Sequence, residues 1–463
     1  MEVLLLGTGA ADGWPSPFCG CRSCTAMREE RRTRLPSAAL LDGRILVDAG
    51  PTVPGAAARL GRSLRDVHHV LVTHAHHDHL DPALLLALDW NPPPQTVHLW
   101  GPAQAIAACR PWVGPRTRVH LHEVGAGDVL RLPTPEGDWI ARTLAATHDP
   151  ATFGGPHDAL AAEALLYDIA DPAGSRLLYA TDTGPLSPHT VAAVAQAHFD
   201  VVVLEETFGA HGDHRTGHLD LSTFPEQLAR LRDAGAIHDA TEVAATHLGH
   251  HNPPEAELRE ILAGWGVRLP DDGATLGRAN RTLVMGGARS GKSAHAEHLA
   301  RDHVDVVYVA TAGPRPGDAE WAARVATHRS RRPARWRTRE GHREAAPALR
   351  EATRGEAVLV DCLTLWLTGV LDDASGGDWE AVGAAALRAA ADAATKDLVD
   401  AVSSSRGNVI LVSNEVGQGI VPATAAGRWF IDLHGRLNQE VARACDDVIL
   451  MTAGVAQRIG AGR

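Results

Sequence analysis

Lysine is nearly absent from this chain of 463 residues. Only Lys292 and Lys396 occur, so 44 − 2 = 42 of the basic residues are arginine. A lysine that lies within a motif therefore indicates a chemical role rather than an ordinary solvent-exposed residue. Basic residues are also outnumbered by acidic ones, because 44 − 56 gives a net charge of −12. This negative net charge argues against sequence-independent binding to nucleic acid, and no nucleic-acid partner is expected.

Long apolar runs and aromatic residues are scarce as well. No apolar run reaches the roughly 18–20 residues that span a bilayer, and residues 1–10 carry no basic stretch before their short apolar run, so neither a membrane span nor a signal peptide is expected. Hydrophobic residues make up 44% and charged residues 22% of the chain, as in ordinary soluble proteins. The length predicts two or three domains, and we expect a cytoplasmic protein.

The pattern of apolar segments changes once along the chain. Residues 1–268 hold short apolar strands separated by loops rich in histidine and glycine. Residues 269–280 are polar and turn-rich, which predicts a linker. Residues 281–463 alternate strands with helical stretches, including an alanine-rich helix over 384–395, and this alternation is typical of a parallel α/β sheet. The sequence therefore predicts two unlike α/β domains.

Three of the six cysteines lie within six residues, as Cys19, Cys21 and Cys24. The other three are scattered, so the pattern does not indicate a secreted disulfide framework. In a reducing cytosol, three thiols so close together favour metal binding. The alternative is that these thiols are free or redox-active.

A run of metal-ligand residue types follows an apolar strand at His74-Ala-His-His-Asp-His79. Three further ligand types, His148, Asp182 and His247, each stand just past another apolar strand. Loops at strand ends can converge on one edge of a sheet sandwich. Imidazoles and carboxylates suit zinc, manganese or iron, so the pattern predicts a site for two metal ions. The plain alternative is a solvated polar loop.

These residues, with Gly7-Thr-Gly9 and Val47-Asp48-Ala-Gly50, resemble the metallo-β-lactamase superfamily over residues 1 to about 265. The resemblance implies an αββα sandwich with a dinuclear centre. It assigns one metal to His74, His76 and His148, the second metal to Asp78, His79 and His247, and the bridging position to Asp182.

Within that superfamily, Cys19-Gly-Cys21-Arg-Ser-Cys24 with His250 resembles the phosphoribosyl cyclic phosphodiesterase family. By this resemblance the three cysteines and His250 hold a structural zinc, and His218 acts as general acid. Two divalent metals, zinc or manganese, would then hydrolyse a phosphodiester in a small molecule. The substrate stays open, because one fold hosts many reactions.

The second domain begins with a phosphate-binding pattern in a strand–loop–helix context. Glycines there let backbone amides face phosphate oxygens at a helix N-terminus. Lys292 would reach the β- and γ-phosphates, and the Ser293 hydroxyl would hold Mg²⁺. The residues of this loop are Gly286, Gly287, Ala288, Arg289, Ser290, Gly291, Lys292 and Ser293.

Residues 281 to about 461 resemble one family throughout, the bifunctional adenosylcobinamide kinase/adenosylcobinamide-phosphate guanylyltransferases. The matching segments are 286–297, 307–311, 320–332, 336–338, 359–364 and 412–422. The resemblance implies adenosylcobinamide and GTP or ATP with Mg²⁺ as substrates, an oligomer, and His328 as the guanylylated residue. The implied nucleotide contacts are Thr311, Arg329, Arg332, Glu340 and Asp361. Thr327 departs from members that have a second histidine there.

Two other classes of function remain open from the residues alone. One is an RNA-processing hydrolase with a nucleotide-binding regulatory module, which the metal motif permits but which the acidic charge and the few aromatic rings disfavour. The other is a GTP-dependent switch protein, against which the surroundings of His328 argue. Covalent labelling by GTP separates the fused enzyme from both.

Overall fold

The chain folds into two compact units, Met1–Gly277 and Arg278–Arg463. The computed structural model describes residues 1–148, 163–211, 217–301, 303–312, 317, 326, 332–353, 355–419 and 421–460. Most of the stretch predicted as a linker, 269–280, is folded into the first unit, where β14 (Thr275–Leu276) pairs with the first strand. The Asp272 carboxylate accepts hydrogen bonds from the Thr8 hydroxyl and the Leu35 amide. A polar segment can thus be ordered by partners more than 200 residues away.

The first unit contains two seven-stranded sheets. The first sheet has the order β14–β1–β2–β3–β4–β5–β6, with β1 (Val3–Gly7), β2 (Ala38–Leu41), β3 (Ile45–Val47), β4 (His69–Leu71), β5 (Val97–Gly101) and β6 (Val119–Glu123). The second has the order β13–β12–β11–β10–β9–β8–β7, with β7 (Val129–Thr134), β8 (Gly137–Ala145), β9 (Leu165–Ala170), β10 (Arg176–Ala180), β11 (Val201–Glu205), β12 (Glu242–Thr246) and β13 (Val267–Arg268). Strands β3 to β6 run parallel to one another, as do β10 to β13, whereas β3 is antiparallel to β2 and β10 is antiparallel to β9.

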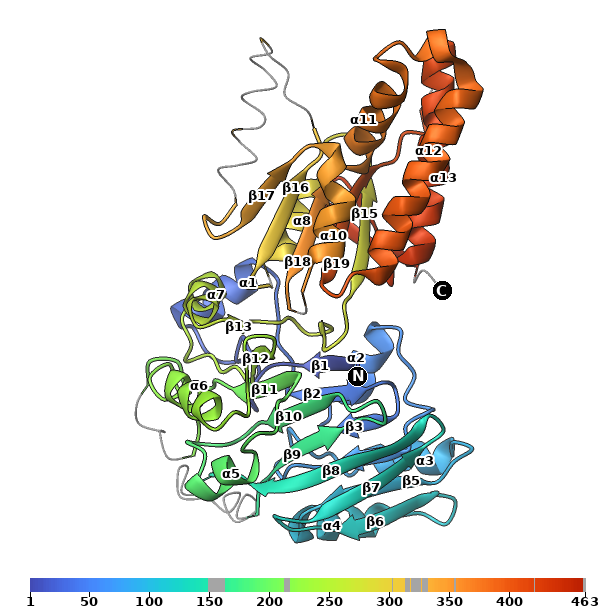
Figure 1. The fold of residues 1–463 in the computed structure, drawn as a ribbon. Helices are drawn as coiled ribbons and strands as arrows, with labels where there is room; N and C mark the ends of the chain where they lie inside the picture. The colour runs from blue at the N-terminus through green and yellow to red at the C-terminus, as the bar shows by residue number, and fades with distance from the viewer. Residues whose placement is uncertain are drawn as a thin grey trace. The chain divides into compact units, whose positions relative to one another are not determined.

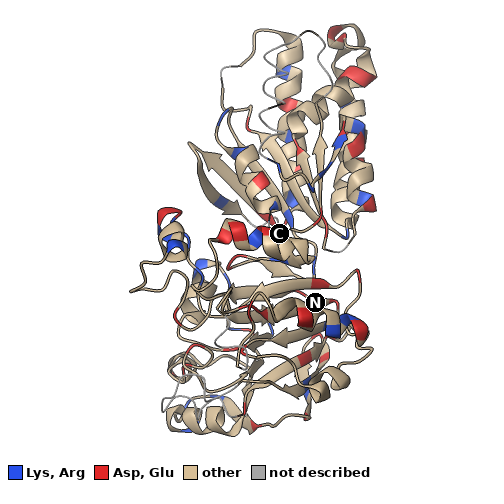
Figure 2. Ribbon diagram, turned by 90° about the vertical axis from the view of Figure 1, so that its left-hand side faces the viewer, with Lys and Arg blue, Asp and Glu red and all other residues tan. Residues whose placement is uncertain are grey.

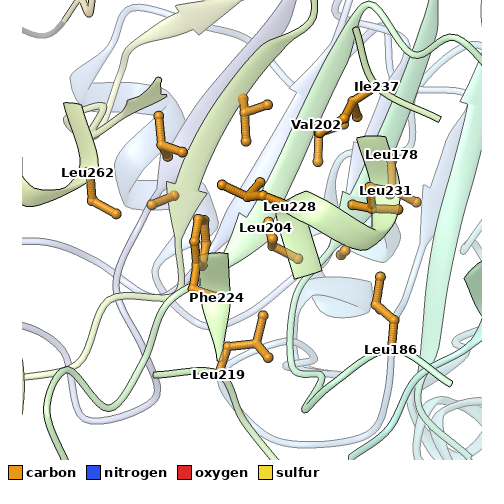
Figure 3. Packing of buried hydrophobic residues seen from close by; sticks show 14 of the residues in the cluster. Leu178, Leu186, Val202, Leu204, Leu219, Phe224, Leu228, Leu231, Ile237 and Leu262 are labelled. Atoms are coloured by element: carbon orange, nitrogen blue, oxygen red, sulfur yellow. The ribbon is translucent and has the colours of Figure 1, made fainter. Parts of the chain in front are cut away.

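The sheets pack face to face and helices cover their outer faces. Alternate side chains of both sheets form the inner core, which includes Leu71, Tyr167 and Val203. On the outside of the second sheet, Leu204 and Leu178 meet Leu228 and other helix residues (Figure 3). The helices of this unit are α1 (Arg22–Glu29), α2 (Val53–Arg59), α3 (Leu84–Trp90), α4 (Ala103–Cys109), the 3-10 helix η1 (Arg110–Trp112), α5 (Pro188–Ala193), α6 (Phe224–Asp233) and α7 (Glu255–Gly264). The predicted αββα sandwich is confirmed.

The second unit has one seven-stranded sheet in the order β17–β16–β18–β19–β15–β20–β21. All neighbouring strands are parallel except β20 and β21. The strands are β15 (Arg281–Gly286), β16 (Val306–Ala310), β17 (Arg337–Glu340), β18 (Ala357–Asp361), β19 (Asn408–Asn414), β20 (Asp447–Thr452) and β21 (Val455–Gly460). The helices are α8 (Lys292–Ala300), the 3-10 helix η5 (His342–Glu344), α10 (Ala345–Glu351), α11 (Leu363–Ser375), α12 (Trp379–Ser404) and α13 (Ala425–Ala444).

Helices cover both faces of this sheet (Figure 1). Helix α8 packs on one face through Ala296 and Ala300, and α10, α11, α12 and α13 pack on the other. Strands covered on both faces read as continuous apolar runs, as in Ala357-Val-Leu-Val360. The predicted parallel α/β domain is therefore confirmed, and the helix predicted over 384–395 lies within α12.

Acidic and basic residues are interspersed along the helices of both units (Figure 2). Among the described residues, no helix is both long and apolar enough to cross a bilayer.

We predict that the two units unfold in separate transitions, because each has its own buried core. Leu204→Ala should destabilise only the first unit and Leu411→Ala only the second, by about 2–5 kcal/mol each. Both leucines are fully buried, whereas Val129→Ala, at an exposed position of β7, should change little. Differential scanning calorimetry of the full chain measures the two transitions, and a joint shift of both by either leucine variant would contradict the division.

Candidate metal centre and nucleotide site

The first unit brings its candidate metal ligands together beyond the ends of four strands. His74, His76, Asp78 and His79 lie in the loop after β4. The other three follow strands of the second sheet: His148 follows β8, Asp182 follows β10 and His247 follows β12. The possible ligand atoms of His74, His76, His148 and Asp182 lie within 4.8 Å of one another, and so do those of Asp78, His79, Asp182 and His247.

Asp182 belongs to both groups. Its Oδ2 is 3.0 Å from Nε2 of His74 and 3.0 Å from Nε2 of His79, while its Oδ1 is 2.9 Å from Nε2 of His247. The Asp78 carboxylate reaches the second group only, at 3.0 Å from Nε2 of His79. The arrangement therefore forms two ligand pockets that share one carboxylate.

In three of these histidines, the nitrogen opposite the candidate ligand atom contacts another polar group. Nδ1 of His79 is 2.7 Å from the Asp48 carboxylate, Nδ1 of His247 is 3.0 Å from the Thr207 hydroxyl, and Nδ1 of His148 is 3.1 Å from the Gly217 carbonyl oxygen. Such contacts fix the ring orientation and direct Nε2 at a metal. Sequence reasoning assigned no role to Asp48, although it lies in the Val47-Asp48-Ala-Gly50 segment at the end of β3.

The backbone is strained at several of these residues. Asp48, Asp182 and His247 have φ angles of 61°, 50° and 55°, in the left-handed region that residues other than glycine rarely adopt. A Cβ on Gly50 would collide with the backbone oxygen of Asp78, so glycine allows the loop of Asp78 to approach β3. Strain of this kind clusters at functional sites.

The electrostatics of the pocket fit cation binding. Burial would raise the pKa of Asp182, but His247 and His79 outweigh burial and hold it well below its usual range. Burial and then His79 lower the pKa of His74 to about 3. Burial also acts to lower the pKa of His247, yet Asp182 raises it to about 10. Without a metal, His247 therefore keeps its proton beside an ionised Asp182, and a metal ion binds such ligands by displacing protons.

Buried carboxylate oxygens give the test of whether a metal fits here. Asp78 Oδ2 and Asp182 Oδ1 are buried and lie 3.0 Å from Nε2 of His79 and 2.9 Å from Nε2 of His247, in contacts that lack hydrogen-bond geometry. An unsatisfied buried carboxylate oxygen is costly unless it is paired or coordinates a cation. The donor set of imidazoles and carboxylates therefore fits two divalent metal ions of the zinc or manganese type.

His218 borders the same centre and is held by Glu205 at the end of β11. Its Nδ1 is 3.2 Å from both oxygens of that carboxylate. Glu205 is itself fixed by the amides of Leu219 and Thr183. Burial lowers the pKa of His218, but Glu205 outweighs it and raises the pKa above its usual value. Sequence reasoning missed Glu205. The one feature in the sequence that could have indicated it is its position as an acidic residue at the end of an apolar strand.

Cys19, Cys21, Cys24 and His250 form a separate cluster with ligand atoms within 4.8 Å of one another. Nδ1 of His250 is 3.3 Å from Sγ of Cys19 and 3.9 Å from Sγ of Cys21. None of the six cysteines, all of which are described, forms a disulfide. Burial would raise the pKa of Cys21, but hydrogen bonds led by the Cys24 amide lower it to about 6. A tetrahedral Cys₃His zinc site fits this set.

In the second unit, the loop between β15 and α8 has the form of a phosphate-binding loop. Gly291 and Arg289 have φ angles of 95° and 59°, and a Cβ at Gly286 would lie 2.6 Å from the Met451 carbonyl oxygen. Lys292 opens α8, and its Nζ donates to the Gly287 carbonyl oxygen at 3.1 Å. Sharp turns into a helix N-terminus of this kind direct backbone amides at an anion.

The Asp361 carboxylate lies opposite that loop at the end of β18. The Ser293 hydroxyl donates to it at 3.4 Å and the Tyr308 hydroxyl at 2.7 Å. The Arg332 guanidinium lies over the Tyr308 ring, 3.3 Å from its centroid. A hydroxyl beside a carboxylate at a phosphate loop is the pair that holds Mg²⁺ in nucleotide-binding domains.

Of the remaining predicted site residues of this unit, two are described and two are not. Thr311 and Glu340 stand at the ends of β16 and β17, and the ends of β16, β17 and β18 are in register at Ala310, Glu340 and Asp361. The Thr311 hydroxyl donates to the Cys362 carbonyl oxygen at 2.7 Å. His328 and Arg329 lie outside the described residues.

Fold and site together define a metallo-β-lactamase-fold unit joined to a phosphate-loop nucleotide-binding unit, and comparison with known proteins agrees. The Cobinamide kinase / cobinamide phosphate guanyltransferase family model matches residues 282–459, and the Beta-lactamase superfamily domain model matches residues 43–270. The chain is 43% identical over 179 residues to the bifunctional adenosylcobalamin biosynthesis protein CobP of Pseudomonas aeruginosa, covering 38% of this chain and 94% of that protein. It is 41% identical to CobU of Salmonella typhimurium over 38% of this chain and 98% of that protein.

Through its second unit, the chain belongs to the cobinamide kinase/cobinamide phosphate guanyltransferase family. The family membership makes it a transferase, and the first unit adds a fused hydrolase-fold domain. The Zn²⁺-bound PqqB structure from Methylobacterium extorquens is similar to the first unit, with 20% identity, a TM-score of 0.50, and coverage of 60% of this chain and 99% of that one. This likeness shows the fold of the unit.

Asp182→Ala should remove metal from the dinuclear centre, because that carboxylate is shared by both ligand pockets. We expect fewer metal equivalents per chain, while the cysteine cluster retains its zinc. Elemental analysis of the purified chain measures this, with Asp233→Ala at an exposed end of α6 as the control. Loss of every metal together would mean that the ligands are wrongly divided between the sites.

Proposed function

We propose that the first unit hydrolyses a phosphodiester bond in a small molecule at a dinuclear metal centre. The observation that carries the proposal is the pair of ligand pockets sharing Asp182, with His218 beside them. Two divalent cations held there would lower the pKa of water to near neutrality and neutralise phosphate oxygens. His74, His76 and His148 would hold one cation and Asp78, His79 and His247 the other.

The chain's own groups would complete the reaction by moving a proton. Glu205 holds Nδ1 of His218, so proton transfer to the leaving oxygen would use Nε2 of that ring. The buried contacts of Glu205 keep the carboxylate in place, which supports His218 as a general acid. A structural zinc on Cys19, Cys21, Cys24 and His250 would tie the N-terminal loop to the loop that follows His247.

We also propose that the second unit phosphorylates adenosylcobinamide and then transfers GMP to its phosphate. The observation that carries this proposal is the phosphate loop facing Asp361, together with the activities named in the description of the matched family. Lys292 would place its ammonium group at the β- and γ-phosphates. Mg²⁺ held by Ser293 and Asp361 would neutralise charge on the same phosphates. Thr311, Arg329, Arg332 and Glu340 are the proposed further nucleotide contacts.

The guanylyl transfer would pass through His328. A neutral ring nitrogen attacks the α-phosphorus of GTP, an N–P bond forms, and the bond to the bridging oxygen breaks, so that pyrophosphate leaves with its electron pair. An oxygen of the cobinamide phosphate then displaces the imidazole. The spacing over 320–332 supports this assignment, and imidazole is largely unprotonated at pH 7.

His218→Ala should slow the hydrolysis of esters with poor leaving groups far more than that of esters with good ones, because only the former need a proton. The measurement is kcat across aryl phosphodiesters of graded leaving-group pKa, with exposed His238→Ala as control. An equal loss over the whole series would exclude general-acid catalysis by His218.

Lys292→Ala should abolish phosphorylation of cobinamide, since the β- and γ-phosphates lose their fixed cation. Lys396→Ala gives a matched control, because it removes the only other lysine, at an exposed position of α12. Transfer of label from γ-labelled nucleotide measures both variants. Kinase activity retained by the Lys292 variant would rule out the phosphate-loop assignment.

His328 should carry GMP after incubation of the chain with GTP and Mg²⁺. A phosphoramidate is labile in acid and stable in base, unlike a serine ester, so α-label should be lost in mild acid and survive alkali. His328→Ala should lose the label and the guanylyl transfer but retain more of the kinase activity, whereas His342→Ala should keep the label. Acid-stable label, or label on the His328 variant, would overturn the assignment.

A further inference from the structure

A further cluster, made of three histidines, lies on the first sheet of the first unit. The candidate hydrolase centre does not use these residues. His98 is on β5, and His120 and His122 are on β6, the edge strand of that sheet. Their possible ligand nitrogens lie within 4.8 Å of one another. From these three side chains we propose a further metal site, which takes one divalent transition-metal ion of the kind that prefers imidazole.

Strand register explains why the three rings meet. In the parallel pair β5–β6, His98 stands opposite His120, and Trp100 stands opposite His122. Residues two apart on a strand point to the same face, so the rings of both strands gather on one face of the sheet. Nδ1 of His98 lies 2.9 Å from Nε2 of His122. Tetrahedral zinc with nitrogen ligands at roughly 2.0–2.1 Å needs nitrogens about 3.3 Å apart, so a small adjustment would suffice.

The residues behind the cluster hold it in place. The Trp100 ring stacks on His122 with centroids 3.9 Å apart and an angle of 14° between the planes. The indole Nε1 donates to Nδ1 of His69 at 3.3 Å, and Nε2 of His69 is 2.9 Å from the Pro133 carbonyl oxygen. Both ring nitrogens of His69 are therefore engaged, which makes it a support for Trp100 rather than a ligand.

Three imidazoles without a carboxylate favour zinc, copper, nickel or cobalt over magnesium or calcium, which require oxygen ligands. His120 is exposed and the other two rings are half-buried, so solvent can reach the ion and water can supply the fourth ligand. A bound ion would cross-link β5 to the edge strand β6. The site would stabilise the sheet edge.

Zinc uptake by the tag-free full chain, with its other metal sites already filled, tests the proposal. After equilibrium dialysis against buffered Zn²⁺, elemental analysis should find one more zinc in the wild type than in His120→Ala. Because His120 is exposed, this variant loses little packing. His189→Ala removes another exposed histidine, on α5, and should match the wild type. Equal zinc in the wild type and His120→Ala would overturn the site.

Trp100 supplies a second measurement at the proposed site. Ni²⁺ bound beside His122 should quench Trp100 fluorescence, and His120→Ala should remove that part of the quenching. Trp100→Phe should also remove it while still taking up the ion, because the three ligands remain. Quenching that is the same in the wild type and Trp100→Phe would place the ion elsewhere and contradict the proposal.

Discussion

The buried carboxylate of Asp182 is the group on which the first unit's centre depends. It follows β10 of the second sheet, yet it contacts imidazoles from the loop after β4 of the first sheet as well as His247 after β12. A buried carboxylate is stable only when charge or hydrogen bonds compensate it. The two sheets are therefore linked at their strand ends by an interaction that is favourable only when all of these ligands converge.

The same geometric rule serves the second unit with different groups. Its parallel strands end together, and the ends of β15 and β18 bring the phosphate loop and Asp361 face to face. In open α/β sheets, ligands bind outside the carboxyl ends of the strands. The buried apolar strands fix the positions of the loops that follow them. The polar residue just past each strand can therefore differ between sites without disturbing the core. This division explains how both sites combine a rigid core with reactive loops.

Much of both sites could be predicted from the sequence because their residues are contiguous or follow recognisable strands. The run His74 to His79 and the loop Gly286 to Ser293 are examples. Asp48 and Glu205 could not be assigned roles, because a carboxylate at a strand end shows its partner only once the loops are packed. The polar stretch 269–280 is predicted as a linker for a similar reason: the partners that order Asp272 lie near residues 8 and 35.

The register between strands β5 and β6 is the other property that could not be predicted from the sequence. His98, His120 and His122 look like scattered polar positions until β5 and β6 are aligned. A shift of one residue in that pairing would turn the histidines of β6 to the opposite face, so the cluster depends on a single register.

Several of the abundant arginines have fixed carboxylate partners. Arginines supply buried and half-buried ion pairs, as where Arg34 meets Glu255 at 3.2 Å and Arg176 donates two hydrogen bonds to Asp168. The planar guanidinium fork suits such fixed carboxylate partners, whereas the lysine ammonium is a compact charge on a flexible stem. In the proposed kinase reaction a phosphoryl group changes position, and the flexible lysine side chain is suited to follow it. If the proposed kinase function holds, Lys292 at the start of α8 is the position where we expect replacement of lysine by arginine to reduce activity, even in a chain that otherwise prefers arginine.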